Sequence, residues 1–279
     1  MAIIGQRNIF CTIDKKGDQV FAKAIILSKD FEASAWLAVG ISDYLIREAD
    51  WEISKAPANI SLGKGIAIDA IGIKANTGIG SALVHLTEAN GGILIKSLIF
   101  ECVKGLMQAE TYLFSERGYP NEAAYEAYWM DKESNGCRFY SHPSQDKYGW
   151  FEHVGPYQRT GNLFNRCKSY QLSIHGTDLT LQGTFHDSYH EMAGEIRFDN
   201  ETGIISECSL SMFRAPGSSC LETTAHGQSF VGKNLYDMTR KQVVGLVGGP
   251  HGCYHLTDLM ADMLPLIQEH MPETQPSEK

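Results

Sequence analysis

The sequence predicts an α+β protein of two similar halves from an internal duplication, each a small antiparallel meander covered by helices on one face. Residues 45–57 and 204–216 align without gaps, and both segments alternate apolar and polar positions and end in Ala-Pro. Such alternation is typical of a half-buried strand, and the closing proline favours a strand end because it cannot donate to a ladder. A helical pattern follows each segment, as expected for helices that cover a sheet.

The elements of each half follow from the same patterns. In the first half we expect strands at residues 8–20, 21–27, 36–39 and 45–53, with a polar turn at 14–18, and a helix at 93–113. In the second half we expect strands at 168–174, 179–185, 195–198 and 204–213, and helices at 219–228, 237–246 and 254–271. Each half therefore opens with a meander and closes with a long helix.

These elements divide the chain into four parts. We expect a degenerate N-terminal copy at residues 1–111, an aromatic-rich connecting segment at 112–168, a metal-site copy at 169–271 and a disordered tail at 272–279. Half of the aromatic residues of the chain lie between positions 112 and 170. Because a flexible linker is poor in aromatic residues, we expect this segment to pack against other parts of the folded chain. It either joins the two halves or walls a pocket for a flat, apolar substrate.

Composition excludes several classes of protein. The 279 residues are 43% hydrophobic and 20% charged, as in a soluble globular protein, and the formal net charge is −9. Without a Lys/Arg cluster, this charge argues against nucleic acid or an anionic membrane as a partner. The N-terminus has no signal-peptide pattern, and no run approaches the roughly 18 apolar residues of a spanning helix. We therefore expect a cytoplasmic protein, while the sequence leaves open whether it is a homo-oligomer.

The aligned halves separate residues of the scaffold from residues of a site. The register sets Phe31 on His190 and Ser61 on Cys220, and a slightly shifted register sets Lys96 on Cys253 and Leu98 on His255. If the repeat is real, the first copy folds with these four positions replaced. The four residues of the second copy then serve function rather than folding, whereas a chance match of two strand-rich segments is the alternative.

Three breaks between elements in the second half supply candidate metal ligands. A glycine-rich turn at residues 248–252 delivers Cys253 and His255 to the first turn of the last helix, whose N–H groups favour the thiolate. Cys220 begins the preceding helix, and His190 precedes a strand. The extra oxygen donor is Asp187 or Glu191, and His186 is the alternative to His190.

Two thiolates and two imidazoles suit zinc or iron better than magnesium or calcium. Their spacing is neither that of a zinc finger nor that of a Rieske centre, and buried residues with a reactive cysteine are the alternative to a metal. Three further residues are candidate acid–base groups, although His251 also fits an exposed turn: His226, Tyr254 and His251. We interpret the remaining cysteines as structural residues: Cys11, Cys102, Cys137, Cys167 and Cys208.

Residues 172–264 resemble the bacterial proteins grouped as domain of unknown function 2889. The resemblance is carried by Asp187, residues 190–192, the Pro-x-x-x-Cys at 216–220 and the Gly-Cys-x-His-Leu at 252–256. It implies a shared site without an assigned chemistry. The order of meander, loop cysteine, helix and Cys/His pair is also distantly similar to NifU-like iron–sulfur scaffold proteins, but Tyr254 separates the pair and the first scaffold cysteine is missing.

These observations predict a metal-dependent enzyme of lyase or hydrolase type, with zinc or iron as cofactor, that acts on a small oxygenated substrate. Aromatic compounds are the leading substrate class because of the aromatic segment. The sequence lacks GxGxxG, GxxxxGK[ST], GxSxG and HExxH motifs, which disfavours nucleotide-dependent, serine-hydrolase and zincin activities. Two alternatives are a metal or iron–sulfur carrier and a non-catalytic binding protein.

Overall fold

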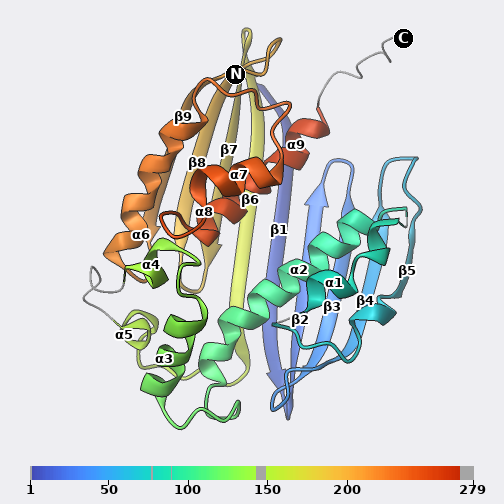
Figure 1. The fold of residues 1–279 in the computed structure, drawn as a ribbon. Helices are drawn as coiled ribbons and strands as arrows, with labels where there is room; N and C mark the ends of the chain where they lie inside the picture. The colour runs from blue at the N-terminus through green and yellow to red at the C-terminus, as the bar shows by residue number, and fades with distance from the viewer. Residues whose placement is uncertain (1, 77, 89, 143–148, 271–279) are drawn as a thin grey trace. The chain divides into compact units, whose positions relative to one another are not determined.

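A computed structural model describes residues 2–76, 78–88, 90–142 and 149–270 (Figure 1). The fold is mixed α and β, with helices and a large antiparallel sheet. The expected tail at 272–279 lies outside the described residues. Within the described ranges, no helix has both the length and the apolar character needed to cross a membrane.

The chain forms two compact units. The N-terminal unit contains Asn8–Ala127 and Gly155–Cys167, and the C-terminal unit contains Met1–Arg7, Tyr128–Val154 and Lys168–Lys279. Strands β1 (Ala2–Lys16) and β6 (Asn162–His175) each contribute residues to both units. The expected boundaries at residues 111 and 168 stay predictions.

The N-terminal unit holds the first meander. Its strand order is β5-β4-β3-β2-β1-β6, with β2 (Gln19–Ser28), β3 (Glu32–Gly40), β4 (Ile46–Lys55) and β5 (Gly63–Ile66). Its helical elements are η1 (Ile68–Ala70), α1 (Ile79–Ala82), η2 (His85–Glu88), α2 (Gly92–Ala109) and η3 (Glu110–Tyr112). Helix α2 packs on β2 and β3 through an apolar face, which confirms the helix expected at 93–113.

The C-terminal unit holds the second meander. Its strand order is β1-β6-β7-β8-β9, with β7 (Asp178–Asp187), β8 (Glu191–Asp199) and β9 (Ile205–Arg214). Its helical elements are α4 (Arg138–Ser141), α5 (Trp150–Val154), α6 (Ser218–Glu222), η5 (Thr223–Phe230), α7 (Arg240–Val247), α8 (Tyr254–Ala261) and α9 (Leu264–Gln268), and α3 (Glu122–Lys132) runs into it. Helix α8 packs on β7 and β8.

Two expected helices are shorter than the sequence predicted. The helix expected at 219–228 is the brief α6 followed by the 3₁₀ element η5. The helix expected at 254–271 is divided into α8 and α9, because Pro265 has no N–H to continue the backbone ladder of α8. The helix expected at 237–246 begins after Thr239, which forms a capping box with Gln242.

The two meanders have irregularities at corresponding positions. The β3–β4 register shifts between Glu32 and Ala33, and the β8–β9 register shifts between Glu191 and Met192. A second shift lies between residues 38 and 39 in the first meander and between 197 and 198 in the second. The gap-free sequence register pairs these positions with each other, so the agreement extends from the apolar pattern to the backbone geometry.

Candidate metal site

A tight turn between β7 and β8 builds the first part of the site. One carboxylate oxygen of Asp187, Oδ1, accepts hydrogen bonds from the backbone N–H groups of Tyr189 at 2.8 Å and His190 at 2.7 Å. The Asp187 N–H in turn donates to the His190 carbonyl at 2.9 Å. Aspartate favours such turns because its side chain can replace a backbone acceptor. Arg214 at the end of β9 also donates to the Asp187 carbonyl at 2.7 Å, and this hydrogen bond connects the turn to the neighbouring strand.

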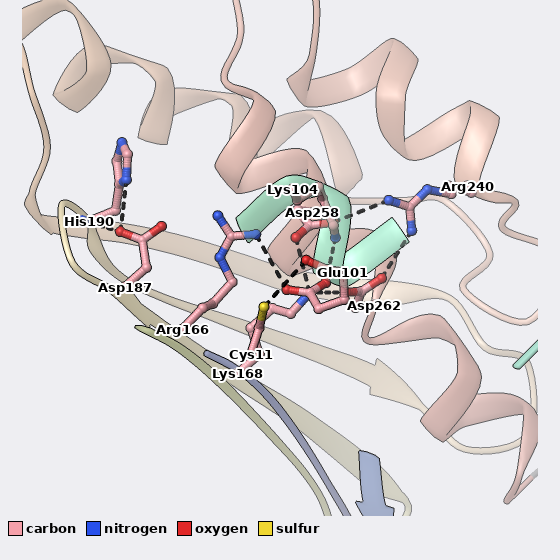
Figure 2. A network of polar contacts seen from close by, with 10 residues as sticks. All are labelled: Cys11, Glu101, Lys104, Arg166, Lys168, Asp187, His190, Arg240, Asp258 and Asp262. Atoms are coloured by element: carbon pink, nitrogen blue, oxygen red, sulfur yellow. Dashed lines mark hydrogen bonds and ion pairs between the residues drawn. The ribbon is translucent and has the colours of Figure 1, made fainter. Parts of the chain in front are cut away.

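The same Asp187 oxygen lies 3.1 Å from Nδ1 of His190. Figure 2 shows the two side chains and the contact between them. If Nδ1 carries the ring hydrogen and donates it to the carboxylate, the lone pair of the imidazole is on Nε2. A carboxylate that accepts from one ring nitrogen orients the other one toward a metal. Asp187 and His190 are both buried, with 6% and 2% of their surfaces exposed.

His255 completes the group from the first turn of α8. Its ring stacks on that of His190, with centroids 3.7 Å apart and an interplanar angle of 26°. Phe185 contacts the His255 ring edge-on, with centroids 5.7 Å apart. One ligand atom each from Asp187, His190 and His255 lies within 4.8 Å of the others. Two imidazoles and one carboxylate are a donor set that suits zinc or iron.

A buried ion cluster anchors α8 beneath this site. Lys168 on β6 is fully buried and donates from Nζ to Asp258 at 3.0 Å and to Asp262 at 2.5 Å. Arg240 at the start of α7 donates to the other oxygen of each carboxylate, at 3.3 and 3.0 Å (Figure 2). The cluster ties the helix that carries His255 to the sheet and to α7.

Figure 2 also shows Glu101 of the N-terminal unit, which pairs with Lys104 at 2.6 Å and with Arg166 at 3.3 Å.

Cys253 does not have the ionisation state that the sequence predicted. It is the N-cap residue of α8, and burial raises the pKa of its thiol to about 12. The backbone N–H groups of Leu256 and His255 lower this pKa, but the cost of burying a charge outweighs them. The helix N-terminus alone therefore leaves Cys253 a neutral thiol.

The five predicted metal residues fall into two sets. Asp187, His190 and His255 form the group of mutually close donors described above, and neither Cys220 nor Cys253 belongs to it. Cys220 instead packs in an apolar cluster with Cys137 and Phe139. The sequence register could not distinguish these sets, because it places residues along elements but not across them.

Two alternative ligands lie on the surface. His186 and Glu191 face each other across the β7–β8 pair, with Nδ1 and Oε1 3.9 Å apart. Their side chains are 49% and 43% exposed, in contrast to His190. The structure thus places His190, rather than His186, with the other donors, and Asp187, rather than Glu191, as the nearby carboxylate.

The three predicted acid–base residues have other contacts. Nε2 of His226 lies 2.8 Å from the carbonyl oxygen of His251, whose ring stacks on His142 with centroids 5.7 Å apart. The hydroxyl of Tyr254 donates to Glu133 at 3.3 Å, and burial raises its pKa to about 12. Their assignment as acid–base groups stays a prediction.

Residues of the aromatic segment reach the turn, and sequence reasoning did not identify them individually. The ring of Trp150 on α5 lies edge-on to Tyr189, with centroids 4.8 Å apart. His153 on the same helix lies with Nε2 2.9 Å from the Tyr189 carbonyl, and burial lowers its pKa. The aromatic density of the segment was the available signal, but it could not tell which ring meets which turn.

Residues 169–268 match the family described as protein of unknown function DUF2889. The matched range includes all the candidate residues from Asp187 to His255. No curated protein matches the chain. No solved structure matches it either. The similarity to NifU-like proteins has no support from these comparisons.

Proposed function

We propose that the C-terminal unit is a metal-dependent enzyme that holds zinc or iron through Asp187, His190 and His255. The observation that supports this proposal is the convergence of three ligand atoms from the β7–β8 turn and α8. When bound, the ion would act as a Lewis acid toward a small oxygenated substrate in lyase or hydrolase chemistry. Three protein donors leave coordination positions for water or substrate, which favours a catalytic over a structural site.

Each residue has a distinct part in this proposal. His190 and His255 would bind through ring nitrogens. Asp187 would bind through its carboxylate, which also holds the His190 ring by its Oδ1 contact at 3.1 Å. The Trp150 and Tyr189 rings beside the turn support a flat, aromatic substrate, because rings of this kind contribute stacking contacts. His226, Tyr254 and His251 remain candidates for proton transfer at the edge of the unit.

We also propose that the two meanders arose by duplication and that the first copy has lost its site. The paired register shifts at Ala33 and Met192 support this history. The first copy carries Phe31, Ser61, Lys96 and Leu98 where the second carries its candidate ligands. The structure shows no disulfide among its seven cysteines, all of which lie in the described ranges, and this supports a reducing, cytoplasmic location.

The burial of the donors favours an enzyme over a metal carrier. A carrier that passes its cargo to a partner needs accessible ligands, whereas His190 is 2% exposed. A non-catalytic binding protein differs in another way, because it should contain no stoichiometric metal after purification without chelator.

The proposal is tested by metal analysis of full-length protein purified without chelator. We expect stoichiometric zinc or iron in the wild type and its loss in His190→Ala and in His255→Ala. His186→Ala is the matched control, because it removes an exposed imidazole from the same hairpin. Stoichiometric metal in both site variants would contradict the ligand assignment.

The catalytic part of the proposal needs a second measurement. A panel of aromatic esters and hydroxy acids should contain a compound that the metal-loaded wild type converts, and His255→Ala should convert it at least about a hundredfold more slowly, as on removal of a group that stabilises transition-state charge. Equal conversion by the two proteins would contradict an active role for this site.

A further inference from the structure

Cys137 belongs to a second group of donor atoms, all of them sulfur. Cys137 and Cys220 are buried together with Phe139, and the side chains of Met130 and Met212 pack against them. We call Cys137, Cys220, Met130 and Met212 the sulfur cluster. Its members come from α3, the start of α4, β9 and α6, so four separate segments bring sulfur to one place.

The third cysteine of this region, Cys253, belongs to a segment that contacts the segment of Cys137. The Arg138 N–H donates to the Gly252 carbonyl at 2.9 Å, which joins the residue after Cys137 to the residue before Cys253. One residue earlier, a Cβ added to Gly136 would lie 2.3 Å from the Tyr254 hydroxyl oxygen. Residues 136–138 therefore lie beside residues 252–254. Cys137 is the middle residue of the first segment, and Cys253 is the middle residue of the second.

The ionisation of the Cys137 thiol agrees with the geometry. Burial raises its pKa. Such a thiol stays neutral unless a cation takes the place of its proton.

We propose that Cys137, Cys220 and Cys253 bind a thiophilic metal centre. Thiolate donors select iron–sulfur clusters, zinc or copper(I) over hard cations, and Met130 and Met212 would provide a polarisable, apolar lining. This centre is separate from the Asp187–His190–His255 group in its donor atoms. It does not depend on the proposed enzymatic function.

Within this class, we favour an iron–sulfur cluster over a single ion. Among the residues that the structure describes, the three thiols do not form a group with all ligand atoms within 4.8 Å of one another, as a single ion would require. In an iron–sulfur cluster, each thiolate binds a different iron, so the sulfurs lie farther apart.

The test uses the full-length protein under anaerobic conditions with two probes, Fe²⁺ with sulfide and Zn²⁺ alone. We expect the wild type to acquire the visible charge-transfer absorbance of an iron–sulfur cluster, with stoichiometric iron and sulfide. Cys137→Ala, Cys220→Ala and Cys253→Ala should each lose at least nine tenths of this signal. Binding of Zn²⁺ that is lost in all three cysteine variants, without cluster formation, would support the same ligands but contradict the choice of a cluster over a single ion. The control is Cys208→Ala, which removes a buried thiol from β9 of the same unit and should retain the signal.

Three results would overturn the proposal: no binding of either probe by the wild type, full binding by Cys137→Ala, or equal loss in Cys208→Ala. If an alanine variant fails to fold by circular dichroism, alkylation of the wild type decides instead. Bound metal should then protect Cys137, Cys220 and Cys253, identified by mass spectrometry, and unprotected Cys137 would overturn the proposal. His190→Ala and His255→Ala should keep the sulfur-bound metal, so this outcome is independent of the proposed enzyme.

Discussion

The rings of His190 and His255 stack with centroids 3.7 Å apart, although one residue lies in the turn before β8 and the other lies in the first turn of α8. The first ring is held within its own turn by Asp187, whereas the second depends on the placement of α8. Interactions that position α8 should therefore influence metal binding without contacting the metal.

Removal of the Lys168 ammonium should destabilise the protein strongly. Lys168→Met leaves the carboxylates of Asp258 and Asp262 without their buried partner, and breaking a buried ion pair in this way costs about 3–5 kcal/mol. Denaturant unfolding of the full chain measures the change. Arg240→Met is the control, because Arg240 contacts the same carboxylates but its side chain is 58% exposed. Its loss should cost less than about 1 kcal/mol, and equal costs would contradict the assigned role of Lys168.

Addition of one methyl group at Gly252 should disrupt the turn before α8. A Cβ at this position would lie 2.1 Å from the Val247 carbonyl oxygen and 2.5 Å from that of Gly248, so the backbone must move. We expect Gly252→Ala to lower the melting temperature and to weaken metal binding by displacing His255, as measured by calorimetry and metal titration.

The matched control for this change is Gly245→Ala in α7. An added Cβ there meets nothing within 4 Å, and alanine is favoured over glycine in a helix by roughly 0.5–1 kcal/mol. We expect this variant to be slightly more stable than the wild type. A wild-type melting temperature in Gly252→Ala would show that the turn tolerates the methyl group.

Asp187→Asn should weaken metal binding more than it changes the fold. Asparagine can still accept the backbone hydrogen bonds of the turn, but it loses the negative charge that supports the His190 ring. Loss of a carboxylate that orients a metal-binding imidazole typically costs 10–100-fold in affinity. Competition with a chromophoric chelator measures the dissociation constant, with His186→Ala as reference. Unchanged affinity in Asp187→Asn would contradict the assigned role of this carboxylate.

Alkaline pH should destabilise the protein in part through Cys208. Burial raises the pKa of this thiol from 9.0 to about 12, so the unfolded state releases the proton first. Its contribution to stability is fully present below pH 9 and is lost as the pH rises toward 12, at about 1.4 kcal/mol per pH unit. Unfolding of Cys208→Ala between pH 9 and 11 should show a shallower decline than that of the wild type. Parallel declines in the two proteins would contradict this prediction.

The strands could be predicted from sequence because alternation along a strand is a local signal. The segments expected at 45–53 and 204–213 correspond to β4 and β9, and the polar turns around them are where the chain reverses. Helix ends were less predictable. The effect of Pro265 on a helix is local, but the apolar pattern continues through it, and that pattern led to one predicted helix instead of α8 and α9.

The sequence predicted which residues belong to the candidate site, but it did not predict which of them lie close together. Asp187, His190 and His255 were identified from their positions at breaks between elements, yet the sequence grouped the imidazoles with Cys220 and Cys253. Cys137 was read as a structural cysteine, because nothing near it in the sequence indicates that Cys220 packs against it. Contacts between distant segments depend on how helices cross the sheet, which periodicity does not encode.

The hairpin that joins β7 to β8 contains its own carboxylate–imidazole pair, within four consecutive residues. That pair can form as soon as two neighbouring strands meet, on the microsecond timescale of hairpin formation. The partner ring from α8 arrives only when the last helices dock on the sheet. Affinity for a cation would therefore rise late in folding, so metal uptake during refolding would report on helix docking rather than on sheet formation.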